Sequence, residues 1–231
     1  STLPPSFTSD GETLCDAADI SNAFNDYFSS NSSVDNNIVP PFRNRLSNIS
    51  IGNITITTEG ILNLILNLDV KKCSGPDCIP NAFLLRYSQW CARYFETIFN
   101  TTIRTGTVPS SWKIGEVLPL FKSGDKHSFS NYRPISLTSY SCKMLEHVIF
   151  KHIMNFLESN NLLSNFQHGF RRGFSTVTQL IAFSHDISMN LDAGYQVDAI
   201  FIDFSKAFDT VIHSKLLHKL DKILNNPQLV H

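Results

Sequence analysis

Near its C-terminal end the chain reads Ala199-Ile200-Phe201-Ile202-Asp203-Phe204-Ser205-Lys206-Ala207-Phe208-Asp209. The run before Asp203 is short, unbroken and apolar, with β-branched and aromatic side chains, which is typical of a strand buried on both faces. Because this run ends on Asp203, the pattern places a carboxylate at the rim of a sheet, where such sheets hold metal ligands and general bases. The alternative is an aspartate that caps the next helix.

Asp209 fits the capping role better than Asp203 does. Residues 210–220 follow it with apolar side chains at helical spacing, so Asp209 stands where a helix N-cap is expected. Asp203 therefore needs another explanation, and we predict that it is a metal ligand or a general base.

Charge divides the 231 residues into two regions. Residues 1–70 hold two basic and eight acidic residues, whereas residues 71–231 hold 17 basic and 12 acidic residues. The mild positive balance of the second region favours a polyanionic partner. We expect an acidic connector region with short helices over 1–70 and the domain that carries the chemistry over 71–231.

Apolar periodicity predicts most of the secondary structure. Helices are expected over 17–28, from residue 58, and over 82–103, 141–158, 175–194 and 210–220. Strands are expected over 114–121, 131–137 and 199–203, and residues 29–37 are expected to form a linker.

Several common kinds of active site are excluded by the residues present. The sequence has no Gly-Lys-Ser/Thr phosphate loop, no Gly-x-Ser-x-Gly elbow and no His or Cys cluster with zinc-ligand spacing. Ser205 stands where a phosphohydrolase with a strand-end aspartate has its second aspartate. The five cysteines form no CxxC pair, which favours reduced thiols in an intracellular protein. No stretch reaches the ~20 apolar residues that a membrane span requires.

Cations stand at two places that could contact phosphate groups. Lys122 and Arg133 flank a predicted hairpin, which can hold both over a triphosphate; the alternative is two solvated surface cations. Gly169 and Gly173 surround an arginine pair that includes Arg171, an arrangement that lets a backbone approach a nucleic-acid strand. The alternative there is an ordinary polar turn.

Six segments within residues 117–220 together resemble the reverse transcriptases of non-LTR (LINE-type, jockey-like) retrotransposons, in that family's order and spacing. The longer segments are Val117-Leu118-Pro119-Leu120-Phe121-Lys122-Ser123-Gly124-Asp125, Asn131-Tyr132-Arg133-Pro134-Ile135-Ser136-Leu137-Thr138-Ser139, Gln167-His168-Gly169-Phe170-Arg171 and the stretch 201–211. The shorter ones are 143–146 and 175–176. Upstream, Ser74-Gly75-Pro76-Asp77-Cys78-Ile79 is similar to the family's Gly-Pro-Asp-Gly-Ile segment, with Cys78 in place of its second glycine, and residues 22–28 are similar to its connector.

The resemblance implies a role for each matching residue. Asp203 would be the catalytic aspartate that binds metal first in the palm, and Phe208 would exclude a ribose 2′-hydroxyl, although a core aromatic is the alternative for Phe208. Lys122 and Arg133 would hold the deoxynucleoside triphosphate. The residues that would line the template and the incoming base are Gln167, Gly169, Phe170 and Arg171.

The resemblance also implies a fold and an activity. The fold would be α+β, a polymerase right hand of which 71–231 holds the fingers and the first palm strand. The activity would be RNA-directed DNA synthesis with an RNA template, a DNA primer, deoxynucleoside triphosphates and two Mg²⁺ ions, in the cytoplasm and nucleus. The chain has no Asp-Asp pair, which that family carries further downstream. We therefore expect an inactive fragment whose metal site is completed elsewhere; the alternative is a non-catalytic remnant that binds nucleic acid.

Overall fold

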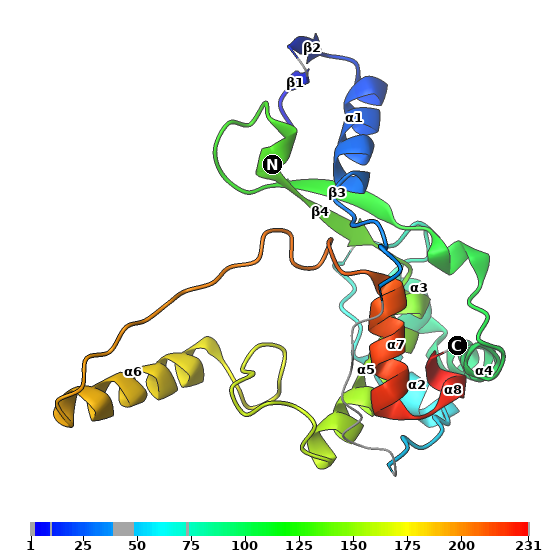
Figure 1. Ribbon diagram of the computed structural model, residues 1–231. Helices are drawn as coiled ribbons and strands as arrows, with labels where there is room; N and C mark the ends of the chain where they lie inside the picture. Colours follow the sequence, from blue (N-terminus) through cyan, green and yellow to red (C-terminus); the bar gives the residue numbers. More distant parts are fainter. Residues whose placement is uncertain (1–2, 10, 39–48, 73, 231) are drawn as a thin grey trace. The chain divides into compact units, whose positions relative to one another are not determined.

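The computed structural model describes residues 3–9, 11–38, 49–72 and 74–230, with helices and antiparallel hairpins (Figure 1). They form two compact units. The first contains the described residues up to 152 and those from 206 onward, and the second contains residues 153–205. Residue 70, where charge predicts a boundary, lies inside the first unit, and the division into a connector and a polymerase region stays a prediction.

The larger hydrophobic core of the first unit is mainly helical. It is built from α2 (Thr58–Leu66), α3 (Asn81–Arg86), α4 (Ser88–Thr105), the start of α5 (Tyr140–Ser159) and α8 (Pro227–Val230). Ile61, Ile65 and Phe99 are fully buried in it. Thr57 caps α2 by accepting a hydrogen bond from the Gly60 amide at 3.2 Å, and Gly106 ends α4 in the left-handed conformation that glycine adopts without strain.

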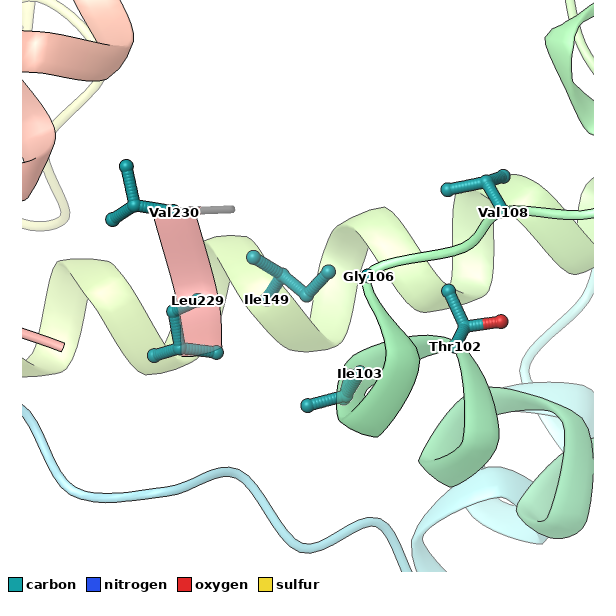
Figure 2. A pocket seen from close by; sticks show the side chains of 7 residues that line it. All are labelled: Thr102, Ile103, Gly106, Val108, Ile149, Leu229 and Val230. Carbon is teal, nitrogen blue, oxygen red and sulfur yellow. The ribbon is translucent and has the colours of Figure 1, made fainter. Parts of the chain in front are cut away.

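A cavity of about 200 Å³ lies where the end of α4 meets α5 and α8 (Figure 2). Its lining is formed by Thr102, Ile103, Gly106, Val108, Ile149, Leu229 and Val230. Thr102 supplies the one side-chain polar group of this lining, so the cavity lacks the charged groups that phosphate or metal binding requires.

Two hairpins and a helix form the rest of the N-terminal part. The short hairpin of β1 (Phe7–Ser9) and β2 (Glu12–Leu14) leads into α1 (Ala17–Ser29), which Asp16 caps through its carboxylate. The longer hairpin pairs β3 (Glu116–Phe121) with β4 (Tyr132–Leu137). Apolar residues of these elements form a second core, whose buried members are Phe7, Ile20, Phe24, Phe129 and Tyr132.

The last segment of the chain returns to the first unit. After α7 (His213–Leu224), the backbone carbonyl of Leu224 accepts a hydrogen bond from the Ile51 amide at 2.9 Å. The buried Asn226 side chain donates to the Ile51 carbonyl at 3.0 Å, and the Ser50 hydroxyl donates to the Asn225 carbonyl at 2.7 Å. Residues 50–51 and 224–226 are therefore joined through both backbone and side-chain hydrogen bonds.

The second unit has a helix but no core. It comprises the end of α5, a loop, α6 (Thr176–Asp192) and an irregular segment, and none of residues 153–205 is buried. Ser175 begins α6 with a capping box, in which its hydroxyl and the Thr178 hydroxyl each accept from the other residue's amide.

Most predicted elements are confirmed, and three predictions are wrong. The helix expected over 82–103 is two helices, broken at Tyr87. Asp209 does not cap α7: turns occupy residues 205–210, and the N-cap is Ile212. Residues 199–203 form no strand, because a strand needs a paired neighbour and both described sheets are complete two-stranded hairpins.

No helix in the described ranges is both long enough and apolar enough to cross a membrane.

Candidate active site

Lys122 and Arg133 project from one face of the β3–β4 hairpin. Arg133 pairs with Leu120, and the Lys122 amide continues the ladder by donating to the Asn131 carbonyl at 2.8 Å. Alternation along the strands therefore places both cations on the same face, as diagonal neighbours with Cα atoms about 7–8 Å apart. Both are exposed, and neither forms an ion pair with a carboxylate of the described residues. Two free cations at this spacing suit a polyphosphate.

The opposite face of the hairpin is fixed by aromatic packing. Phe121 and Tyr132 point toward the second core, where Phe24 lies 5.2 Å from Tyr132 and Phe7 lies 4.9 Å from Phe129, measured between ring centroids. Rings at these separations add packing energy to the burial of their area. One face of the hairpin is thus anchored, and the other presents the cations.

The loop between the two strands is also held in place. His127 accepts a hydrogen bond from the Thr8 amide on its carbonyl at 3.0 Å, and its Nδ1 donates to the Ser6 carbonyl at 2.8 Å. The Tyr132 hydroxyl donates to the Lys126 carbonyl at 2.8 Å. Burial, and secondarily the negative charge of Asp125, raises the pKa of Tyr132, which keeps this hydroxyl protonated as a donor.

Arg171 holds the loop that was predicted to contact the template in its conformation. Its guanidinium group donates to both carboxylate oxygens of Glu158, at 2.8 and 2.7 Å, and to the Ser164 carbonyl at 2.7 Å. The same group lies 4.3 Å from the ring centre of Phe174, and the side chain is only 8% exposed. The hydrogen bond raises the pKa of Arg171 and lowers the pKa of Glu158.

The other predicted template residues lie on the surface of this loop. The Gln167 side chain donates to the Gly169 carbonyl at 3.1 Å, which closes a small local ring. Phe170 adopts a left-handed conformation, with φ of 61°, and its side chain is 83% exposed. Gln167, Gly169 and Phe170 thus lie on one short loop, and Arg171 fixes that loop through its hydrogen bonds to Glu158.

Asp203 and Phe208 lie in irregular segments of different units. Asp203 is exposed in the second unit, within a stretch where Ile200, Phe201 and Ile202 are each more than three-quarters exposed. Figure 1 shows this stretch as an extended trace without a strand arrow. Phe208 belongs to the first unit, in the turns before α7, and is 75% exposed, so it is not a core aromatic.

Comparison with known proteins identifies the family. The family model described as "Reverse transcriptase (RNA-dependent DNA polymerase)" matches residues 124–230. The probable RNA-directed DNA polymerase from transposon BS of Drosophila melanogaster is 34% identical over 173 residues, which is 74% of this chain. The RNA-directed DNA polymerase from mobile element jockey of the same organism is 30% identical over 75% of the chain. Residues 124–230 belong to the reverse transcriptase family.

The chain spans about 19% of the length of these curated relatives. The matched region covers the β4 strand, the Arg171 loop and the Asp203 segment. The mixture of helices and antiparallel hairpins agrees with the α+β character of the polymerase right hand that this family implies.

Reverse transcriptases as a family use divalent metal ions, so we tested whether the described residues fit one. No group of three or more His, Cys, Asp or Glu side chains gathers anywhere in the described ranges. Asp203 alone offers one carboxylate on an irregular segment. The described residues therefore do not form a metal site by themselves.

Sequence reasoning missed two features of the candidate site. The first is the pair of contacts that Arg171 makes with Glu158, 13 residues before it, and with Phe174, three residues after it. No sequence spacing predicts either contact. The aromatic support beneath the hairpin comes from Phe7 and Phe24, far away in sequence, in a region predicted to be a connector.

Proposed function

We propose that this chain supplies the fingers region and one active-site carboxylate of an RNA-directed DNA polymerase of a non-LTR retrotransposon. The reaction would join the 3′-hydroxyl of a DNA primer to the α-phosphate of a deoxynucleotide opposite an RNA template. The observation that carries the proposal is the pair of exposed cations, Lys122 and Arg133, on one face of a hairpin whose other face is anchored.

Each remaining residue then has a task in that proposal. Lys122 and Arg133 would neutralise and orient the triphosphate, which favours its approach in a reactive geometry. Gln167, Gly169 and Phe170 would border the template and the incoming base, and Phe208 would exclude the ribose 2′-hydroxyl. Asp203 would be one ligand for a divalent ion, for which we propose Mg²⁺, in a site completed by carboxylates from outside residues 1–231.

The test uses a full-length polymerase of this element that contains residues 1–231. Lys122→Ala and Arg133→Ala are each expected to raise KM for deoxynucleotides roughly tenfold, since each removes a charge-assisted contact to phosphate. RNA affinity should stay within twofold of wild type. Lys113→Ala, which removes an exposed lysine outside the hairpin, is the matched control.

Asp203→Asn in the same polymerase is expected to abolish primer extension while RNA binding persists, with Asp209→Asn as the control carboxylate. If Lys122→Ala and Arg133→Ala weaken RNA binding and leave KM unchanged, the hairpin contacts the template backbone instead. If Asp203→Asn retains activity within tenfold of wild type, the chain is better described as a non-catalytic nucleic-acid-binding remnant.

A further inference from the structure

The outer face of α4 carries two aromatic side chains in contact with each other. Trp90 and Tyr94 are 56% and 55% exposed, and their ring centroids lie 4.3 Å apart with the planes inclined at 47°. The buried residues of α4, which include Cys91 and Phe99, face the helical core. The two rings are therefore not part of the core, and large exposed apolar side chains gathered on one face mark a contact surface more often than isolated ones do.

The exposed charge on this face is positive. Arg93 lies three residues after Trp90, and Arg104 lies 14 residues, or about four helical turns, after it. Both spacings place the arginines on the same side of the helix as Trp90, and both arginines are exposed. Glu96 is the single acid of α4; it lies three residues after Arg93, and its carboxylate accepts a hydrogen bond from the Thr58 hydroxyl of α2. The carboxylate of Glu96 is thus engaged by α2, and the exposed charged residues of α4 are its two arginines.

The preceding helix repeats this combination of rings and arginine. Phe83 and Tyr87 lie 4.9 Å apart between ring centroids and are 43% and 47% exposed. The Arg86 guanidinium group lies 6.0 Å from the ring centre of Tyr87. Farther along α4, a shallow depression of about 340 Å³ is lined by Arg93, Tyr94, Thr97 and Ile98.

Three kinds of contact could cover such a face, and its chemistry favours one. An apolar helix would bury the rings but would leave the arginines without partners. An acidic peptide would match the arginines but would gain little from the aromatic rings. A single nucleic-acid strand satisfies both, because its bases stack on aromatic side chains and its phosphates bind arginine.

We propose that the outer face of α3 and α4 binds single-stranded nucleic acid. Bases would stack on Trp90 and Tyr94, while Arg93 and Arg104 would contact the phosphates. The proposal goes beyond the polymerase reaction and does not depend on it, since the face would hold a strand whether or not Asp203 takes part in catalysis.

The test measures binding of a fluorescein-labelled 12-nucleotide oligouridylate to the 231-residue chain by anisotropy. The double variant Trp90→Ser/Tyr94→Ser is expected to lose at least about tenfold in affinity, since each stacked base contributes on the order of 1–3 kcal/mol. Arg93→Gln/Arg104→Gln should reduce the slope of log affinity against log salt by about 1.4, the value for two phosphate contacts on a single strand. Met189→Ser/Tyr195→Ser, which removes two exposed side chains of the second unit, should change neither.

Tryptophan fluorescence gives an independent measurement of the site. The chain has two tryptophans, and Trp112→Phe leaves Trp90 as the single reporter. Unlabelled oligouridylate should quench that emission over the same concentration range as the anisotropy change. The difference between wild type and Trp90→Phe gives the same signal if Trp112→Phe does not fold.

Three outcomes would overturn the proposal. One is RNA binding without a change in Trp90 emission, which places the strand elsewhere. Another is an equal loss of affinity in Met189→Ser/Tyr195→Ser. The third is unchanged RNA affinity in Trp90→Ser/Tyr94→Ser while sedimentation shows that the variant has lost self-association, which would make the face a protein interface.

Discussion

Arg171 directs its guanidinium group at Glu158 and at its own loop. Four N–H···O hydrogen bonds join it to Glu158 and to two loop carbonyls, and the guanidinium carbon lies over the ring of Phe174, so little of the group is left for a phosphate. We therefore infer that Arg171 positions Gln167 and Phe170 rather than touching the template itself. A bidentate arginine–carboxylate pair is well suited to this task because it fixes orientation as well as distance.

The Glu158–Arg171 pair predicts how the loop responds to acid. The pKa of Glu158 is lowered in the folded chain. The Glu158–Arg171 pair therefore stabilises the loop fully at a pH above 4.5, the ordinary pKa of a glutamate, and this stabilisation is lost as the pH falls through the lowered pKa. Hydrogen-exchange protection of residues 164–174 should accordingly be constant from pH 7 to about pH 5 and decline below about pH 4.5. Glu158→Gln should remove the protection already at pH 7.

Asp186→Asn is the matched control for this experiment, because Asp186 is an exposed acid on α6. It should leave the protection of residues 164–174 and its pH dependence as in wild type. Full protection of the loop in Glu158→Gln at pH 7 would show that the ion pair does not hold the loop.

Single positions also show what the sequence could and could not predict. Lys122 and Arg133 could be placed together because alternation and the hairpin pattern are local properties. The turn at Cys78 could be predicted only from the resemblance, because glycine stands at this position in the family. Cys78 has φ of 55°, the left-handed conformation that a glycine adopts without strain. The Glu158 contact could not be predicted, because it depends on how a loop folds back over 13 residues.

At the scale of elements, the N-terminal segment supports the hairpin that carries the cations. Phe7 is fully buried among Phe24, Phe129 and Tyr132, and the Thr8 amide is bonded to the loop between β3 and β4. The segment predicted as a connector therefore braces the proposed nucleotide-binding hairpin. Strands of three residues are too short for periodicity to predict, so β1 and β2 were not expected.

Phe7→Ala should weaken this brace. Removing a fully buried phenylalanine leaves a cavity, so the free energy of unfolding of the first unit should fall by about 3–5 kcal/mol. Urea unfolding followed by circular dichroism measures the change. Phe166→Ala, at a position 85% exposed, should change the unfolding free energy by less than about 0.5 kcal/mol. Similar stabilities for the two variants would mean that the N-terminal segment does not pack as described.

The helices and the strands differ in how well local sequence predicts them. A helix forms its hydrogen bonds within its own segment, so α1, α2, α5 and α6 appear close to their predicted ranges. A strand forms them with another segment, and residues 199–203 have no such partner among the described residues. Their apolar pattern is real, but the pairing that would make them a strand is not a local property.

At the scale of the whole molecule, burial is distributed unevenly between the two units. Every buried residue belongs to the first unit as far as the structure describes it, whereas residues 153–205 have none. Local stability follows buried apolar contacts, so the second unit should open at a lower free energy than the first.

Limited proteolysis with thermolysin, which cleaves before apolar residues, tests this difference. The first cuts should fall within residues 200–204, where the apolar side chains are between 76% and 86% exposed. Ile114 is 60% exposed but adjoins β3, and we expect it to be cleaved later. First cuts within α2 or the start of α5 would contradict the expected order of stability.

The hydrogen bonds between residues 50–51 and 224–226 can form only late in the synthesis of the chain. Ser50 and Asn225 are 175 positions apart in the chain. At 5–20 residues per second, roughly 9–35 s pass between the synthesis of the two partners. During that interval Ser50 and Ile51 lack their final hydrogen-bond partners, so the first unit of the nascent chain stays incomplete while the whole second unit is synthesised.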